Sequence, residues 1–437
     1  MSMTPSLVAT AMSIAIGVGY SGLATAGDFS GSLTGQTSYG ISSNKLQQQE
    51  WVLDLEYNES LFGGDLTAIG RVRWDSNDEL NKQDANRTDN YSSIGGPLST
   101  GSDGEVELRE FYWDLNTESV FWRLGKQQVV WGEADGLKLL DVINPQNYRE
   151  FILDDFDDSR IPLWMINAEI SLDKGGVLQV LWIPDTSTHE LAPAQSPYAF
   201  SSPVLLPSAP EGVSVVLNEH DASGKLIRDS DFGMRYTNFV GSWDISFNYL
   251  YHTVDSPVVK AHSDNDLLML DQSYERSHLF GGTASTAFGD WTLRSEIAYE
   301  TDRYHRTESV VPGVKKSDQW STVIGLDWQG WTDQFLSMQW YQTSITGQTH
   351  QLVSKAREES LTFLWESKFF NETLSAEWLQ IHSIDNDDGV VQLKLKYNYE
   401  ENLDIYLSGD VFYGDEKQLF GQFDETDRVT FGFSWGF

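Results

Sequence analysis

The 437-residue chain has 65 Asp and Glu residues against 29 Lys and Arg residues, a formal net charge of −36, and no cysteine. Disulfides and thiolate metal sites are therefore excluded, and nucleic-acid binding is disfavoured because phosphate neutralisation requires a basic face. Aromatic residues make up 13% of the chain, and the mean hydropathy is −0.37. Beyond residue 26 no apolar run reaches the roughly 20 residues that a membrane helix needs, so a membrane crossing would have to use amphipathic strands.

Residues 1–26 are predicted to form a secretory signal peptide. Residues 7–23 are largely apolar, and Ala24-Thr25-Ala26 supplies the small residues of a cleavage site. The first basic side chain is that of Lys45, so the region before the apolar run is positive through its amino terminus alone. We expect the mature domain to comprise residues 27–437.

The mature sequence alternates between apolar and polar residues with a period of two, which places one set on each face of a strand. At the end of the chain, apolar residues occupy every odd position from Val429 to Phe437, and polar or small residues occupy the even positions. One lipid-facing side and one wet side are typical of a transmembrane β-barrel strand. An aromatic last residue also resembles the insertion signal of bacterial outer-membrane barrels. A single amphipathic edge strand would alternate in the same way, so the rest of the chain has to decide.

Short turns and long loops alternate along the chain as connections between the predicted strands. Tight turns fall near residues 62–64, 116–117, 174–176, 240–241, 289–290, 329–330, 371–372 and 400–401. Longer polar segments fall near 41–46, 76–103, 127–160, 184–227, 255–274, 302–316, 346–356, 385–388 and 414–425. Short periplasmic turns and long extracellular loops predict an all-β transmembrane antiparallel barrel of about 18 strands, or 16 if one weak segment is a loop. A soluble sandwich or propeller would not sort its loops by length so regularly.

The phase of these strands predicts which side chains face the lumen. The basic positions are Arg71, Arg73, Arg123, Arg235, Arg294, Lys394, Lys396 and Arg428. The acidic positions are Asp54, Glu56, Glu110, Asp114, Glu169, Asp244, Glu296 and Asp404. Mixed charge of this kind braces the wall through ion pairs and sorts the solutes that pass through it.

The segment that follows Arg123 is long and unusually apolar, and we expect it to fold into the lumen as a constriction or plug. Its apolar residues are Val129, Val130, Trp131, Leu139, Leu140, Ile143, Phe151 and Ile152, which a solvated loop would not need. Short helices are predicted at 136–142 and 146–153. The residues assigned to the constriction are Gln127, Trp131, Glu133 and Asp135, with the acidic side chains of the loop near Arg123 and Arg235.

A cluster of carboxylates in the same segment is a candidate cation site. Asp154, Asp155, Asp157 and Asp158 lie within five residues, and clustered carboxylates suit a hard cation such as Ca²⁺. The string lacks the glycine and the distal glutamate of an EF-hand loop. A solvated acidic loop, or one paired with lumen arginines, is the favoured interpretation, and no metal or other cofactor is assigned.

Residues 125–164 resemble an uncharacterised family of Gram-negative outer-membrane barrels. The resemblance rests on Gly125-Lys-Gln127, Trp131-Gly-x-x-Asp-Gly136, Asp141-x-x-Asn-Pro145, Arg149-Glu-Phe151, Asp154-Asp155 and Arg160-Ile-Pro-Leu-Trp164. The genes of that family often lie beside RND-type, lipid-exporter-like inner-membrane pumps, and the first part is also similar to alginate-export and porin-like barrels. The resemblance implies transport without naming a cargo, and it implies as partners an RND-type pump and a periplasmic carrier.

We therefore expect a monomeric outer-membrane channel, in contact with outer-membrane lipid and lipopolysaccharide. The first cargo hypothesis is a hydrophobic or amphipathic molecule, such as a lipid or hydrocarbon, handled together with the pump. The alternatives are a porin for hydrophilic solutes and a structural or adhesin barrel without transport. An enzyme is not expected, because the sequence contains no Gly-x-Ser-x-Gly elbow and no His-x-x-x-His zinc spacing. His252 near Asp255 and His382 near Asp385 are the weak catalytic candidates.

Overall fold

The structure is a computed structural model. It describes residues 27–77, 89–101, 103–173, 175–207, 214–218, 227–264, 267–347 and 349–437, so the predicted signal peptide lies outside the described residues. No helix in these ranges is long and apolar enough to cross a membrane.

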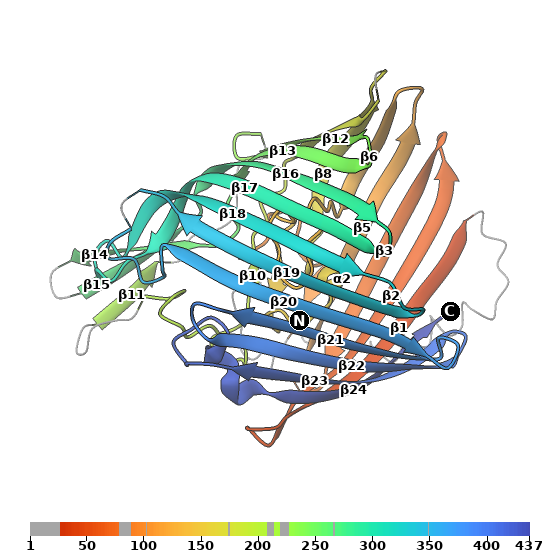
Figure 1. The fold of residues 1–437 in the computed structure, drawn as a ribbon. Coiled ribbons are helices and arrows are strands. Elements are labelled where there is room, and N and C mark those ends of the chain that lie inside the picture. Colours follow the sequence, from red (N-terminus) through yellow and green to blue (C-terminus); the bar gives the residue numbers. More distant parts are fainter. Residues whose placement is uncertain are drawn as a thin grey trace.

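Eighteen antiparallel strands form one closed barrel, in which each strand pairs with the next and β24 pairs with β1 (Figure 1). These strands are β1 (Asp28–Gly40), β2 (Lys45–Leu61), β3 (Gly64–Asp75), β5 (Gly104–Asn116), β6 (Val120–Gln127), β8 (Leu163–Ser171), β9 (Val177–Ile183), β12 (Asp231–Val240), β13 (Trp243–Thr253), β16 (Arg276–Phe288), β17 (Trp291–Arg306), β18 (Val314–Trp328), β19 (Gln334–Ile345), β20 (Arg357–Phe369), β21 (Leu374–Ser383), β22 (Asp388–Glu400), β23 (Leu403–Tyr413) and β24 (Arg428–Gly436). Closure leaves no edge strand whose backbone N–H and C=O groups would be unpaired in lipid. The predicted fold class and the count of 18 are confirmed.

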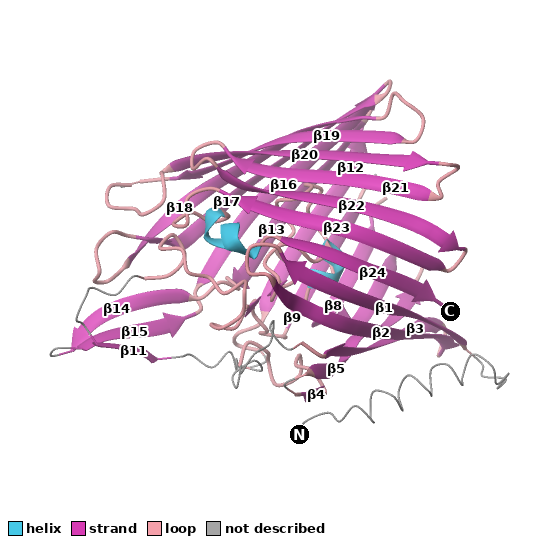
Figure 2. Ribbon diagram, turned by 90° about the horizontal axis from the view of Figure 1, so that it is seen from below, coloured by secondary structure: helices cyan, strands magenta, loops and turns pink. Residues whose placement is uncertain are grey.

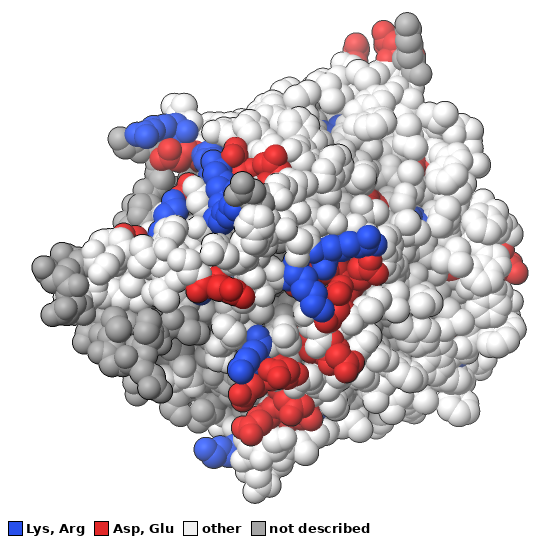
Figure 3. All heavy atoms as spheres, turned by 60° about the vertical axis from the view of Figure 1, so that its left-hand side comes forward, with Lys and Arg blue, Asp and Glu red and all other residues white. Residues whose placement is uncertain are grey.

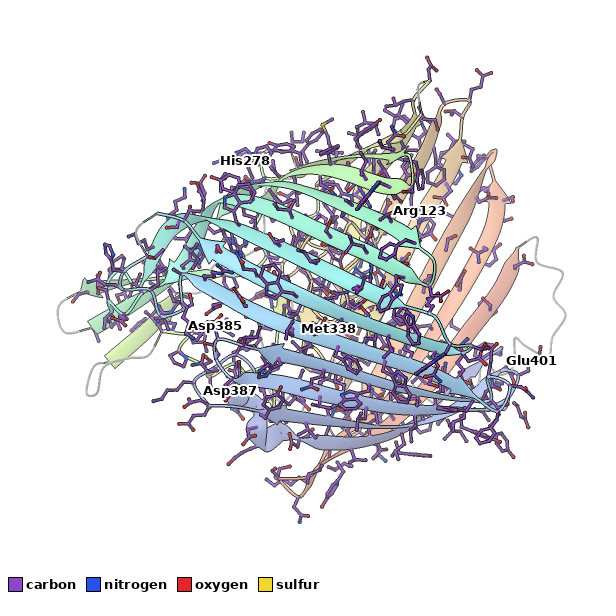
Figure 4. All side chains as sticks on the ribbon, in the orientation of Figure 1. Arg123, His278, Met338, Asp385, Asp387 and Glu401 are labelled. Atoms are coloured by element: carbon purple, nitrogen blue, oxygen red, sulfur yellow. The ribbon has the colours of Figure 1, made fainter. Side chains whose placement is uncertain are left out.

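Loops and turns are sorted to opposite ends of the barrel, as the sequence predicts (Figure 2). Asp385 and Asp387 mark the loop end, which is the extracellular end, and Glu401 marks the turn end, which is the periplasmic end (Figure 4). Two segments expected to be loops, 41–46 and 385–388, are four-residue connections between paired strands. Strands β17 and β18 also extend into the expected loop 302–316 and reduce it to residues 307–313.

The outer face of the barrel is apolar and carries two groups of aromatic residues. In β24, Phe431 is 58% exposed whereas its lumen-facing neighbour Thr430 is 3% exposed, which fits the predicted phase. Near the periplasmic turns, Trp328 contacts Trp291 with ring centroids 6.1 Å apart, and near the extracellular loops, Trp320 contacts Tyr299 with centroids 4.7 Å apart. An apolar band between two aromatic girdles is the outer surface of a barrel that spans the outer membrane.

Small elements and charged side chains lie at the extracellular end. They include a three-stranded sheet of β11 (Ser214–Asn218), β14 (Val258–Asp264) and β15 (Leu267–Ser273), the short strands β4 (Ser99–Thr100), β7 (Asn147–Tyr148) and β10 (Glu190–Leu191), and the 3-10 helix η1 (Gly421–Thr426). The α-helix α2 (Phe156–Ser159) lies inside the barrel (Figure 1). Acidic and basic side chains lie close together among these loops (Figure 3).

Arginine is expected to destabilise the barrel much more on the lipid face of β23 than on its lumen face. Leu407 is 48% exposed on the lipid face near the middle of the strand, and Ser408 lines a cavity in the lumen. Leu407→Arg should weaken refolding into lipid vesicles by about 2–4 kcal/mol because it places a charge in hydrocarbon. Ser408→Arg is the matched control and should cost much less. Equal losses in urea-dependent refolding titrations would mean that the assigned faces are wrong.

Candidate functional site

The loop between β6 and β8, residues 128–162, enters the barrel and is called the inward loop below. At its start the Val129 amide donates to the Asn144 side chain at 2.8 Å, which ties the two arms of the loop together. Trp131 is completely buried, and its indole N–H donates to Gln179 of β9 at 2.7 Å. The loop therefore begins by packing against the wall rather than extending into water.

An apolar cluster joins the first half of the inward loop to one side of the barrel wall. It contains Val129, Trp131, Leu139, Leu140 and Ile143 of the loop with Leu163, Met165, Leu181, Ile183, Leu250, Leu279, Ala298 and Val323 of the wall. Close approach requires a glycine at residue 281 of β16, because a Cβ there would overlap Leu140. Burial of apolar surface contributes about 25 cal/mol per Å². The contact between the loop and the wall is therefore a main source of the free energy that docks the loop.

Ion pairs fix the middle of the loop to β17. Arg294 donates to the carboxylates of Asp135, from the loop, and Asp327, from β18. Gln339 of β19 also donates to Asp135 at 2.8 Å. Glu296 accepts hydrogen bonds from the amides of residues 133 and 140. The loop thus crosses the lumen from β6 to β19.

A buried network of charges holds the second half of the loop against the opposite wall. Arg149 is 1% exposed and donates to Glu50 of β2 at 2.7 Å and to Glu150 at 3.0 Å. Glu150 also accepts from Arg428 of β24, which pairs with Asp410 of β23 at 2.9 Å. Removal of one member of a buried pair leaves an uncompensated charge, so these contacts specify where the loop docks.

The acidic string that suggested a calcium site is paired with basic side chains instead. Asp158 accepts from Arg71 at 2.7 Å, Asp157 pairs with Arg160, and Asp155 lies 3.7 Å from Lys394. No group of three or more His, Asp or Glu residues in the described part of the chain could hold a metal ion. Three of the four carboxylates thus have basic partners, one of them a lumen arginine, and the calcium hypothesis stays a prediction.

Burial and like charge set Asp154 apart from its neighbours. Burial raises the pKa of Asp154 to about 7, and the nearby Glu150 adds to the effect, although Arg149 opposes it. Asp154 lines a cavity of the lumen of about 650 Å³. This carboxyl group can therefore change its charge near neutral pH in a space open to solutes.

Two cavities lie beside the inward loop. The large cavity, of about 650 Å³, is bounded by β1–β3, β20–β24 and residues 152–158 of the loop. The small cavity, of about 340 Å³, is bounded by Gln128, Val129 and Val130 of the loop and by Arg123, Asn167, Glu169, Val177, Gln179, Arg235 and Thr237 of β6, β8, β9 and β12. The inward loop separates them, because it is bonded to wall strands on both sides.

A second long connection covers the extracellular end. Residues 184–207 extend from β9 to the β23–β24 connection, where the Ser202 hydroxyl donates to the Lys417 carbonyl at 2.6 Å. Tyr198 and Phe200 pack with Phe151, Phe412, Phe420 and Phe423. Burial lowers the pKa of His189 in this segment to about 3, so its neutral ring accepts from the amide of residue 146 at 2.8 Å.

Comparison with known proteins identifies the family. The family model "Protein of unknown function (DUF1302)" matches residues 53–388. This chain belongs to the DUF1302 family. No curated protein matches it.

Solved structures show the same fold as this DUF1302 chain. The outer membrane protein OpdK of Pseudomonas aeruginosa has a TM-score of 0.52 at 11% identity, covering 94% of this chain and 98% of OpdK. OpdK with vanillate has a TM-score of 0.53 with the same identity and coverage. In vitro folded OmpT of Vibrio cholerae has a TM-score of 0.43 at 9% identity, covering 95% of this chain and 99% of OmpT. The two OpdK structures confirm the predicted resemblance to porin-like outer-membrane barrels at the level of fold.

The predicted constriction residues lie on or beside the inward loop, but several have partners other than those expected. Arg123 forms a two-point contact with Asp114 of β5 at 2.8 Å, and Arg235 donates to the Val130 carbonyl at 3.3 Å. The loop carboxylates instead pair with Arg71, Arg294 and Arg428. Gln127 is buried and donates to backbone carbonyls, so it supports the start of the loop. Arg73 lines the large cavity.

The predicted helices at 136–142 and 146–153 are wrong. Gly136 has a φ of 78°, which a right-handed helix does not allow. Asn147 uses its side chain to accept from the Arg149 amide at 2.9 Å, which is a local alternative to a helical hydrogen bond. The helix of the loop is the four-residue α2.

One lumen residue that strand alternation missed is Arg109. The register shifts between Ile69 and Gly70 where β3 pairs with β5, and Arg109 is the extra residue of this bulge. Its guanidinium donates to the carbonyls of Asp157 and Asp158 at 2.6 and 3.0 Å. Simple alternation places Arg109 on the lipid face because a bulge leaves no mark in the period-two pattern.

The weak catalytic pairs do not form. His382 is bonded through Nδ1 to the Tyr413 hydroxyl at 3.0 Å, and Asp385 pairs with Lys355. Nε2 of the buried His252 has no hydrogen-bond partner among the described residues. Neither histidine is positioned against its expected aspartate.

Loss of the Glu150 carboxylate should undock the second half of the inward loop. Glu150→Ala leaves Arg149 and Arg428 without the acid that joins them, at a cost of about 3–5 kcal/mol. Hydrogen exchange at the amides of Phe151 and Leu153 should accelerate strongly, whereas the exposed Glu416→Ala should leave it unchanged. Parent-like protection in the Glu150 variant would show that the ion network does not hold the loop.

Proposed function

We propose that this DUF1302 barrel is a selective channel for small hydrophilic solutes, with a preference for cations, in which the inward loop restricts passage. The observation that carries the proposal is the large polar cavity, which extends along the lumen wall and ends against residues 152–158. A cavity lined mainly by charged and polar side chains suits solutes that carry their own hydration or charge. The ties of the loop to β2, β17 and β24 make it the element that sets the width of the path.

The charge of the large cavity supports the cation preference. Its described lining contains the basic residues Arg71, Arg73, Lys394, Lys396 and Arg428 and twice as many acidic ones, Glu50, Asp54, Asp135, Asp154, Asp155, Asp158, Glu366, Glu377, Asp404 and Asp410. Glu366 and Glu377 lie directly opposite each other on β20 and β21. Like charges in that position are unfavourable, and Lys394, the β22 partner of Glu377, compensates one of the two.

The polar lining favours the hydrophilic cargo over the lipid or hydrocarbon cargo that the family resemblance suggested. A hydrophobic cargo requires an apolar binding space, and both described cavities contain several charged side chains. The apolar clusters around Trp131 and Tyr198 are instead filled, since each of these side chains is 0% exposed. A partnership with an RND-type pump would engage the periplasmic end and is compatible with either cargo. A purely structural or adhesin role would not need the open, charged space of the large cavity.

Shortening the inward loop should widen the channel. Replacement of residues 133–158 by a short Gly/Ser turn removes the acidic string and the Glu150 network while leaving all 18 strands. Single-channel conductance in planar bilayers should rise at least about twofold, because the loop narrows the path. Shortening residues 349–355, a loop at the extracellular end, is the control and should not change it. Unchanged conductance in a folded 133–158 variant would remove the loop from the proposed role.

Cation preference should increase with pH. Because the pKa of Asp154 is raised to about 7, its carboxyl group is neutral below that pH and adds a negative charge to the cavity above it. Reversal potentials in a salt gradient should show stronger cation preference at about pH 8.5 than at about pH 5.5. Asp154→Asn should remove this step. Asp404→Asn should lower the preference at both pH values and keep the step. A step of the same size in Asp154→Asn would assign it to another group.

A further inference from the structure

Arg235 differs from the other lumen-facing arginines of the described strands. Each of the others, Arg71, Arg73, Arg109, Arg123, Arg294, Arg303 and Arg428, has a carboxylate oxygen within 4.0 Å. Arg235 has none there, and its hydrogen bond is to the Val130 carbonyl at 3.3 Å. Its buried Nε has no partner among the described residues. Carboxylates that include Glu133 and Asp244 act on Arg235 electrostatically from beyond 4.0 Å, so its guanidinium still has hydrogen-bond donors to offer to an anion.

The small cavity is lined by Arg235 and by a second arginine on the same stretch of wall, Arg123. Arg235 lies beside Gln179 in the β12–β9 pair, and Arg123 lies beside Asn167 in the β6–β8 pair. Three inter-strand spacings separate β12 from β6, about 14 Å along the wall, so two long inward side chains bracket a space for a small molecule. Arg123 uses Nε and Nη2 for Asp114, which leaves Nη1 uncommitted among the described residues. Glu169 is the single carboxylate among the residues of this cavity.

The unpaired side-chain oxygen of Asn167 is an independent indication that the small cavity binds a ligand. Its side chain is 5% exposed and lines the small cavity, and its Oδ1 accepts no hydrogen bond within the described part of the chain. A buried amide oxygen without a donor costs about 1–3 kcal/mol. The neighbouring Gln179 does not share this state, since its amide oxygen accepts from Trp131 at 2.7 Å. The cavity thus combines unused cationic donors with one unused acceptor.

We infer that the small cavity binds a small organic carboxylate that also carries a hydrogen-bond donor, such as a hydroxycarboxylate. Arg235 donates to the carboxylate, Arg123 supports it from the same stretch of wall, and Asn167 Oδ1 accepts from the hydroxyl group. The cavity is reached from the periplasmic end, because Val177 and Thr237 are register partners beside the β8–β9 turn. The site is separated from the large cavity by the inward loop. The proposal of this carboxylate site does not rest on the proposed cation-preferring channel.

Three probes of similar size test this assignment by calorimetry on the folded barrel in detergent. Lactate has both groups, lactamide lacks the charge, and propionate lacks the hydroxyl. Lactate should bind best, lactamide at least about tenfold more weakly, and propionate about fivefold more weakly, as expected for one charged and one neutral hydrogen bond. Absence of saturable lactate binding, or equal binding of lactate and lactamide, would overturn the site.

Variants assign the two roles separately. Arg235→Gln should weaken lactate binding at least about tenfold, and Arg235→Lys should recover part of it because the charge remains. Asn167→Leu should remove the difference between lactate and propionate. Arg357→Gln, which removes an exposed arginine outside both cavities, is the control and should bind like the parent. Heat-modifiable gel mobility checks that each variant is folded. Parent-like lactate binding in a folded Arg235→Gln barrel would refute the role of this residue.

Because binding is measured without any transport, its result is independent of the proposed channel function. Loss of lactate binding in Arg235→Gln with unchanged conductance would support the site and leave the channel proposal as it stands. Failure of the loop deletion to alter conductance would contradict the channel proposal and leave the carboxylate site intact.

Discussion

The pairing of β24 with β1 is the contact on which the rest of the structure depends. Lipid offers no hydrogen bonds, so a sheet can cross it when its first and last strands meet and every backbone group in the wall is paired. Here Gly35 lies opposite Phe433, and the terminal carbonyl of Phe437 accepts from the Gly31 amide at 3.0 Å. The apolar outer face, the alternation of every strand and the enclosed lumen all follow from that closure.

Closure of 18 strands creates an interior that wall side chains cannot fill, and the inward loop occupies much of this space. The two sides of the wall contact the inward loop through different kinds of side chain. The side around β9 and β16–β18 presents apolar residues to Trp131 and Leu140, whereas the side around β2, β3 and β24 presents charged residues to Glu150 and Asp158. Burial of apolar side chains stabilises the docked loop but does not specify its orientation, because the hydrophobic effect is non-directional. The ion pairs specify the position of the loop, so the two kinds of contact together dock it in one arrangement.

This division also explains why the two cavities differ in charge. Arg71 of β3 and Arg428 of β24 pair with carboxylates of the loop, and acidic residues outnumber basic ones in the lining of the large cavity. On the other side, the loop contributes Val129 and Val130 to the small cavity, and the Val130 carbonyl accepts from Arg235 at 3.3 Å. A single loop thereby divides the lumen into two cavities with different sets of charged residues.

The sequence by itself determined the barrel, its strand phase, the side of each connection and the entry of residues 128–162 into the lumen. These features are local, because a period of two and the apolar content of a loop can be read without knowing any partner. Tertiary structure alone decided the Arg109 bulge, the failure of helices near Gly136 and the route of residues 184–207 over the extracellular end. It also decided that the loop acids pair with Arg71, Arg294 and Arg428. Those outcomes depend on residues up to 278 positions apart, and no local pattern in the chain encodes which charged side chains closure brings together.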